Sequence, residues 1–138
     1  VSLVALVNLM LEPLTGFTLQ KIAGVILWPV AWAMGIPVAE AATVASSLGV
    51  KMIINEFVSY LELAASGGAG LSDRSRLILT YALCGFTNLG SVGIMVGGMS
   101  AMCPERRTDI VKLGMPSLIS GTIACCMTGA VVGVLTAP

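Results

Sequence analysis

The sequence predicts an all-α integral membrane protein that contains a re-entrant helical hairpin and a discontinuous transmembrane helix. Of the 138 residues, 57% are hydrophobic and 10% are charged, whereas an ordinary soluble domain carries about 25% charged residues. The mean hydropathy is +0.98. The few charges divide the chain into long apolar runs and one stretch of short ones. Net charge is zero, so no basic patch indicates a nucleic-acid partner.

The first two apolar runs differ in what they predict. The first 11 residues are uncharged and end at Glu12-Pro13, a pattern typical of the end of a spanning helix. The run 22–39 has 18 uncharged residues, with Trp28 and Trp32 one helical turn apart. A span needs about 20 residues, and tryptophan favours the headgroup region. A tilted or interfacial helix and a full crossing therefore both remain open for this run.

The region between Glu40 and Asp73 does not fit a simple span. Its charges leave apolar pieces of about ten residues or fewer, and each is too short to cross a bilayer. Two short helices that enter and leave on the same side, joined near Gly49–Asn55, would explain the pattern. Such a re-entrant hairpin is tolerated at membrane depth where protein or water satisfies its backbone. Ser72 then caps the next helix.

Residues 77–104 form an uncharged run of 28 with a predicted interruption. The segment "CGFTNLGSVG" places Gly85, Gly90 and Gly93 around Asn88 and Ser91. Glycine inside a helix costs about 1 kcal/mol relative to alanine, so three glycines beside two polar residues predict a break at mid-span.

The last uncharged run, 113–138, is long enough for a final span. Its small residues repeat every fourth position and predict a face on which another helix packs closely: Ser117, Gly121, Cys125, Gly129 and Gly133. The basic residues of the preceding loop, 102–112, favour a cytoplasmic position for it.

Glu56 is the residue whose position most needs an explanation. A carboxylate at membrane depth costs about 2.5–3.5 kcal/mol on insertion scales, so it should face water, a ligand or a partner charge. Pairing with Lys51 is the alternative, and we expect that lysine to pair or to extend toward the membrane surface. The amide of Asn55 is expected to satisfy backbone groups of the hairpin.

Asn88, Ser91 and Phe86 are the matching candidates on the interrupted helix. Carboxylate, amide and hydroxyl together can bind a vicinal diol, because a sugar hydroxyl donates to the first and accepts from the second. Hydrogen bonding between helices remains open for Asn88 and Ser91, and core packing remains open for Phe86. The four cysteines have no metal-ligand spacing, so we expect no metal and no cofactor in this part of the chain.

Three strings carry a resemblance to a known family: "GVKMIINEFVSYLEL", "YALCGFTNLGSVGI" and "CPERRTDIVKLG". They resemble the C-terminal part of the concentrative nucleoside transporters. The resemblance implies half of an inverted-repeat transporter: the end of a scaffold helix (1–14), an interfacial helix (18–35), a re-entrant hairpin (38–66), a broken transmembrane helix (72–101) and the last transmembrane helix (108–137).

The same resemblance implies a function. It implies Na⁺- or H⁺-coupled nucleoside uptake by alternating access, in a multi-pass homotrimer of the plasma membrane (the inner membrane in bacteria) that includes an N-terminal half. Glu56, Asn88 and Ser91 would hold the ribose and Phe86 would line the site, with Asn55 and Lys51 in support. Two alternatives remain: a structural helical subunit, or a membrane enzyme with Glu56 as acid or base, which would lack a partner base or metal.

Overall fold

The computed structural model describes residues 2–136, and every secondary-structure element within them is helical. The elements in chain order are α1 (Ser2–Thr15), α2 (Leu19–Ala33), α3 (Val38–Ile53), α4 (Glu56–Ala65), α5 (Asp73–Leu83), α6 (Leu89–Met102), the 3₁₀ turn η1 (Pro104–Arg106) and α7 (Arg107–Leu135). The all-α fold class is confirmed. The expected segments that reach residue 1 or residue 137 extend outside the described residues.

Helices α2 and α3 form the closest packed pair of the N-terminal part. They cross where Gly24 meets Gly49, and a Cβ on Gly49 would lie 2.5 Å from the carbonyl oxygen of Gln20. Gly49 is therefore a packing residue inside α3. The sequence had suggested that it belongs to the hairpin joint, and this part of the prediction was wrong. The axes of α1 and α2 are bent by 79° at the break between them. With its 15 residues, α2 is shorter than a span requires.

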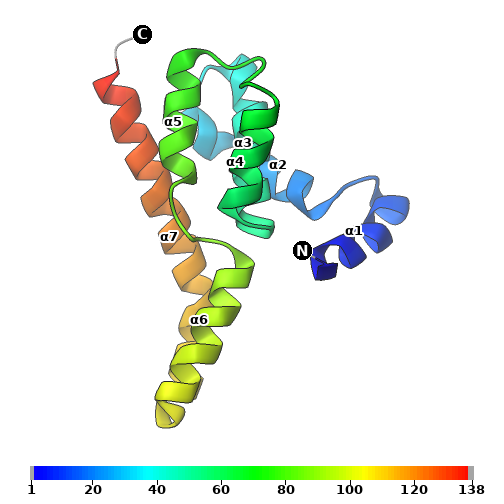
Figure 1. Cartoon of the computed structure of the whole chain (residues 1–138), viewed down its shortest axis with the longest axis vertical. Coiled ribbons are helices and arrows are strands. Elements are labelled where there is room, and N and C mark those ends of the chain that lie inside the picture. Colours follow the sequence, from blue (N-terminus) through cyan, green and yellow to red (C-terminus); the bar gives the residue numbers. More distant parts are fainter. Residues whose placement is uncertain (1, 137–138) are drawn as a thin grey trace.

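Helices α3 and α4 lie side by side and are joined by two residues, Ile54 and Asn55 (Figure 1). The hydroxyl of Ser59 on α4 donates a hydrogen bond to the Ser47 carbonyl oxygen on α3 (2.9 Å). Asn55 is the N-cap of α4, and its side-chain oxygen accepts the N–H of Val58 (2.8 Å). The expectation that Asn55 satisfies backbone groups here is confirmed.

The core lies where α5 packs between the helix pair and α7. Ile78, Leu79, Ala82 and Leu83 of α5 are fully buried. The small residues of α7 permit this approach, because a Cβ on Gly129 would lie 3.1 Å from the Ala82 side chain and one on Gly133 would lie 2.9 Å from Ile78. The packing face predicted from the fourfold spacing is thus confirmed.

The interruption between α5 and α6 spans residues 84–88. The sequence predicts a break in this region, and Gly85 lies in it. Gly90 and Gly93, however, lie in the first turns of α6. Asn88 explains this boundary, because its side chain caps α6 and lets the helix start before these glycines.

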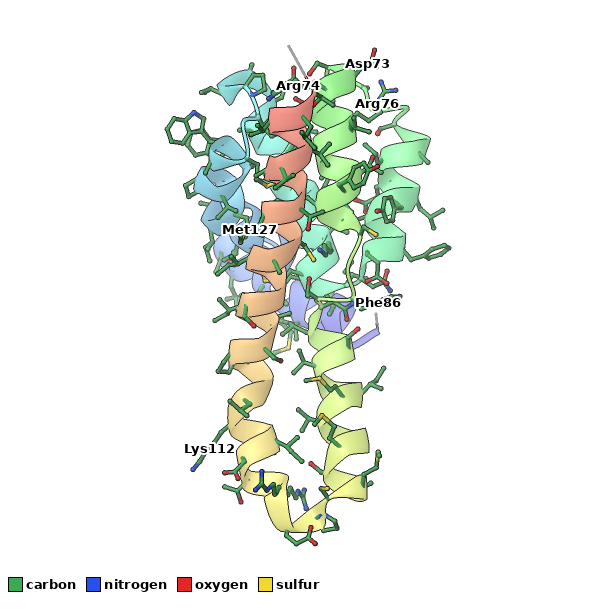
Figure 2. The ribbon with its side chains drawn as sticks, turned by 90° about the vertical axis from the view of Figure 1, so that its left-hand side faces the viewer. Asp73, Arg74, Arg76, Phe86, Lys112 and Met127 are labelled. Atoms are coloured by element: carbon green, nitrogen blue, oxygen red, sulfur yellow. The ribbon has the colours of Figure 1, made fainter. Side chains whose placement is uncertain are left out.

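Beyond the interruption, α6 and α7 continue as a pair toward the turn η1, near which α7 carries Lys112, while Arg74 lies at the opposite end (Figure 2). With 29 residues, α7 is about 43 Å long at 1.5 Å per residue, more than the ~30 Å of a bilayer's hydrocarbon core. Together with η1, it is the one helix among the described residues that is long and apolar enough to cross a membrane.

Arg74 connects three segments at its end of the molecule. Its guanidinium donates three hydrogen bonds to carbonyl oxygens, those of Gly35 (2.8 Å), Gly133 (2.7 Å) and Thr136 (3.1 Å). One side chain therefore joins the start of α5 to the segment after α2 and to the C-terminal end of α7.

Glu40 provides a second link at this end, between α3 and the start of α5. Its carboxylate accepts from the N–H and the hydroxyl of Ser72 (3.1 Å each), and Ser72 is the N-cap of α5 as predicted. Hydrogen bonding by Ser75 and then by Ser72 lowers the pKa of Glu40, and desolvation opposes this effect. The link therefore depends on an ionised carboxylate.

Candidate functional site

Two helix starts meet at the candidate site. The first, α4, begins at Glu56 and follows the hairpin joint, and the second, α6, begins at Leu89 and follows the interruption. Each has an asparagine N-cap, Asn55 and Asn88, because an asparagine oxygen can accept an N–H of the first turn. The two helix starts are thus adjacent in space, although their N-caps are 33 positions apart in sequence (55 and 88).

Asn88 connects these two helix starts through both atoms of its amide. Its Oδ1 accepts the N–H of Ser91 (2.8 Å), and its Nδ2 donates to Oε2 of Glu56 (3.0 Å). Asn88 is 4% exposed and Glu56 is half-buried. A hydrogen bond to a charged group of this kind contributes about 1.5–3 kcal/mol. The sequence placed Glu56 and Asn88 in one site, and the structure brings them into contact.

Lys51 does not pair with Glu56, and it does not extend to the membrane surface. Its side chain is 2% exposed, and Nζ donates to the carbonyl oxygen of Ala82 near the end of α5 (2.8 Å). Both sequence expectations for this residue were wrong, because they considered nearby side chains and solvent but not a helix end 31 residues away. Glu56 therefore keeps its free carboxylate oxygen for water or a ligand.

The C-terminal end of α5 is fully hydrogen-bonded. The last four carbonyl groups of a helix have no partner within it, and in α5 two of them accept from the hairpin: Thr80 from the Tyr60 hydroxyl (2.6 Å) and Ala82 from Lys51. The other two accept N–H groups of the interruption itself: Tyr81 from Cys84 (3.2 Å) and Leu83 from Gly85 (2.7 Å). The interruption is therefore a defined structure fixed in part by α3 and α4.

Phe86 and Ser91 line a hollow of about 170 Å³ beside the interruption, together with Ser117 of α7. Phe86 is 80% exposed, so the interpretation of this ring as a core residue was wrong. Figure 2 shows Phe86 midway between the two ends marked by Arg74 and Lys112. Ser91 is half-buried, and its N–H is the group bound by Asn88.

Sequence reasoning missed three residues next to this site. They are Tyr60, which binds the end of α5, Ser117, which lines the hollow, and Thr87, whose hydroxyl lies 3.9 Å from the sulfur of Cys125. The N-cap role of both asparagines could have been predicted from an asparagine preceding a helical pattern. No local signal in the sequence points to Tyr60, Ser117 or Thr87, because their partners lie on distant helices.

No metal centre is visible in residues 2–136. These residues hold no group of three or more histidine, cysteine or acidic side chains placed to bind a metal ion. Cys84, Cys103, Cys125 and Cys126 are free thiols. The polar groups that the site presents are the carboxylate of Glu56, the amide of Asn88 and the hydroxyl of Ser91.

A comparison with known families decides the relationship. Residues 1–133 match the family model described as "Na⁺ dependent nucleoside transporter C-terminus". The chain belongs to this family. Its resemblance to the concentrative nucleoside transporters is thereby confirmed.

Several relatives of this nucleoside transporter family member are named as transporters. The chain is 38% identical over 144 residues to an uncharacterized transporter of Haemophilus influenzae, covering 96% of this chain and 34% of the relative. It is 43% identical to solute carrier family 28 member 3 of Eptatretus stoutii (88% and 20% covered). It is 37% identical to sodium/nucleoside cotransporter 1 of Mus musculus (89% and 21% covered). These names describe transporters and not enzymes.

Solved structures give the same result for the fold of this transporter segment. CNTnw in an inward-facing substrate-bound state matches with a TM-score of 0.84 at 38% identity, covering 99% of this chain and 34% of that one. A CNTnw variant in the intermediate 2 state matches with a TM-score of 0.90, covering 98% and 35%. The chain spans about a third or less of the length of these curated relatives and structures.

Proposed function

We propose that this chain is the C-terminal part of an ion-coupled nucleoside transporter in which Glu56, Asn88 and Ser91 hold the ribose and Phe86 lines the site. One observation carries the proposal: the 3.0 Å hydrogen bond from Asn88 to Glu56, which joins the start of α4, at the tip of the hairpin, to the interrupted helix. Relatives named sodium/nucleoside cotransporter support the substrate class.

The chemistry of the site suits two adjacent sugar hydroxyls. An ionised carboxylate accepts two or more hydrogen bonds, and Asn88 occupies one oxygen of Glu56. The other oxygen can accept from a ribose hydroxyl, while the Ser91 hydroxyl can donate or accept. Charge-assisted bonds are about twice as strong as neutral ones, so Glu56 is the main determinant of ribose affinity in this proposal.

The helices take the following places in the proposed transporter. Helix α1 is the end of a scaffold helix, and α2 lies along the membrane surface, which the 79° bend between them supports. Helices α3 and α4 form the re-entrant hairpin, α5 and α6 the broken transmembrane helix, and α7 the last span. The expected 102–112 loop is in the structure the turn η1 and the first turns of α7, and this end is proposed to lie in the cytoplasm. This is one half of an inverted repeat, and such sites form at the interface with the other half.

The whole transporter is proposed to be a multi-pass homotrimer of the plasma membrane, or of the inner membrane in bacteria. Sodium is the favoured coupling ion, because the relatives from mouse and rat are named sodium/nucleoside cotransporters. Uptake that is driven by a proton gradient in the absence of sodium would instead identify the proton as the coupling ion. No nucleic acid and no organic cofactor are part of the proposal.

Glu56→Gln in the full-length transporter tests the ribose role, with Glu62→Gln on the exposed face of the same helix as the matched control. Glutamine keeps the size of the side chain and an acceptor for Asn88 but removes the charge. The affinity for uridine, measured by uptake and by uridine-dependent thermal stabilisation, should fall roughly tenfold or more for Glu56→Gln. It should stay near the wild-type value for Glu62→Gln, and both variants should assemble normally.

A competition experiment tests the same proposal from the substrate side. Uridine should compete better than 2′,3′-dideoxyuridine, because the analogue leaves a buried polar partner unpaired at a cost of about 1–3 kcal/mol. Equal competition by both, together with normal uptake by Glu56→Gln, would overturn the ribose role. An assembled protein without any nucleoside binding would instead favour the structural-subunit alternative.

A further inference from the structure

The proposed substrate contacts leave one buried charge without a role, the ammonium group of Lys51. Its side chain is 2% exposed, and its single hydrogen bond goes to the Ala82 carbonyl oxygen (2.8 Å). Within residues 2–136, the one salt bridge joins Arg76 to Asp73, so no described carboxylate neutralises Lys51. A buried charge without compensation is costly, which means that something else in the fold must balance it.

Two helix ends supply the compensating negative charge. Lys51 lies in the last turn of α3, and its Nζ contacts the last turn of α5. The C-terminal end of a helix carries about half a negative elementary charge, so two such ends together amount to about one. This charge matches one monovalent cation.

The surroundings of the amine are enclosed on the side of α7. A Cβ on Gly85 would lie 3.8 Å from Nζ and would collide with the sulfur of Cys125. Gly85 therefore lets the interruption close over the amine. The group lies in a compact position between α3, the interruption and α7.

In transporters with broken helices, unwound carbonyl groups and C-terminal helix ends commonly hold the coupling cation. We propose that the Lys51 ammonium occupies such a cation position in this part of the transporter and fastens the hairpin to the interrupted helix, so that both move as one body. Lys51 is a positioning residue in this proposal, since it acts on the site through α5. The movement rests on the proposed transport function, whereas the cation position does not.

Ion-dependent stability of full-length variants tests the inference. Lys51→Ala removes the amine and leaves space, Lys51→Gln keeps a donor without charge, and Lys21→Ala on the exposed face of α2 is the control. Thermal unfolding is measured in N-methylglucamine, sodium and methylammonium chloride at equal ionic strength. We expect both Lys51 variants to melt below wild type, and sodium or methylammonium to raise the Tm of Lys51→Ala more than that of wild type or the control.

Uptake kinetics add a readout that separates positioning from binding. Lys51→Gln should lower the maximal rate of uridine uptake about tenfold, with little change in the uridine affinity. Wild-type melting and uptake in Lys51→Gln would overturn the inference, and so would a Tm loss in Lys51→Ala that no cation reduces. If Lys51→Ala yields no folded protein, Lys51→Ser, which also removes the amine and leaves space, takes its place in the ion series.

These outcomes are distinct from failure of the proposed function. Loss of uridine-dependent stabilisation in Glu56→Gln supports the ribose role whatever the Lys51 variants do. A missing ion effect at Lys51 overturns only the cation position.

Discussion

The hydrogen bond from Asn88 to Glu56 can be tested by removing the donor while keeping the helix cap. Serine caps a helix about as well as asparagine, so Asn88→Ser preserves an acceptor for the N–H of Ser91 and removes the amide N–H that donates to Glu56. Asn55→Ser is the matched control, because Asn55 caps α4 and has no other side-chain hydrogen bond among the described residues.

The expected magnitude follows from burial. A hydrogen bond to a charged group contributes about 1.5–3 kcal/mol. Because Glu56 is only half-buried, we expect about 1.5 kcal/mol for Asn88→Ser and less than about 0.5 kcal/mol for Asn55→Ser. The free energy of unfolding of the full-length transporter in mixed micelles, titrated with sodium dodecyl sulfate, measures both.

A double-mutant cycle with Glu56→Ala isolates the pair. The coupling free energy between Asn88→Ser and Glu56→Ala should be about 1–1.5 kcal/mol, well above the 0.3–0.5 kcal/mol within which independent sites add. Equal effects of the two asparagine substitutions, or additivity in the cycle, would show that the contact does not stabilise the site and would refute the reasoning from its geometry.

Three further predictions concern the packing and the links at the ends of the helices. Gly121→Ala should destabilise the transporter by about 1–3 kcal/mol, because a Cβ there would lie 2.5 Å from the Thr87 methyl group, whereas Gly97→Ala meets nothing within 4 Å and should be neutral or stabilising in the same thermal assay. Arg74→Gln should lower the Tm more than Arg76→Gln, since Arg74 donates to three carbonyl groups and Arg76 forms an exposed ion pair. The pKa of Glu40 is below its ordinary value of 4.5, so the stabilisation from its carboxylate is complete above pH 4.5 and is lost as the pH falls through the folded pKa. The Tm difference between wild type and Glu40→Gln should therefore shrink on acidification below pH 4.5. A difference that stays constant there would contradict the link to Ser72.

Local chemistry was enough to predict several features. The low content of charge and the long apolar runs predict membrane helices because a bilayer excludes charge. The break near Gly85 and the cap at Ser72 were predicted correctly, because glycine conformational freedom and serine hydrogen bonding act within a few residues. The spacing of small residues on α7 predicted its packing face for the same reason, since a helix fixes which positions share a face.

The partners of the polar groups were not predictable in this way. Lys51 and Ala82 are 31 residues apart, and Glu56 and Asn88 are 32 apart. Such pairs depend on how α3 and α4 lie against the interruption, and that arrangement comes from packing of α3 on α2 and of α5 on α7. The sequence therefore determined which polar residues of an apolar chain needed a partner. The tertiary structure decided which partner each received, because a hydrogen bond forms only where packing brings donor and acceptor within reach.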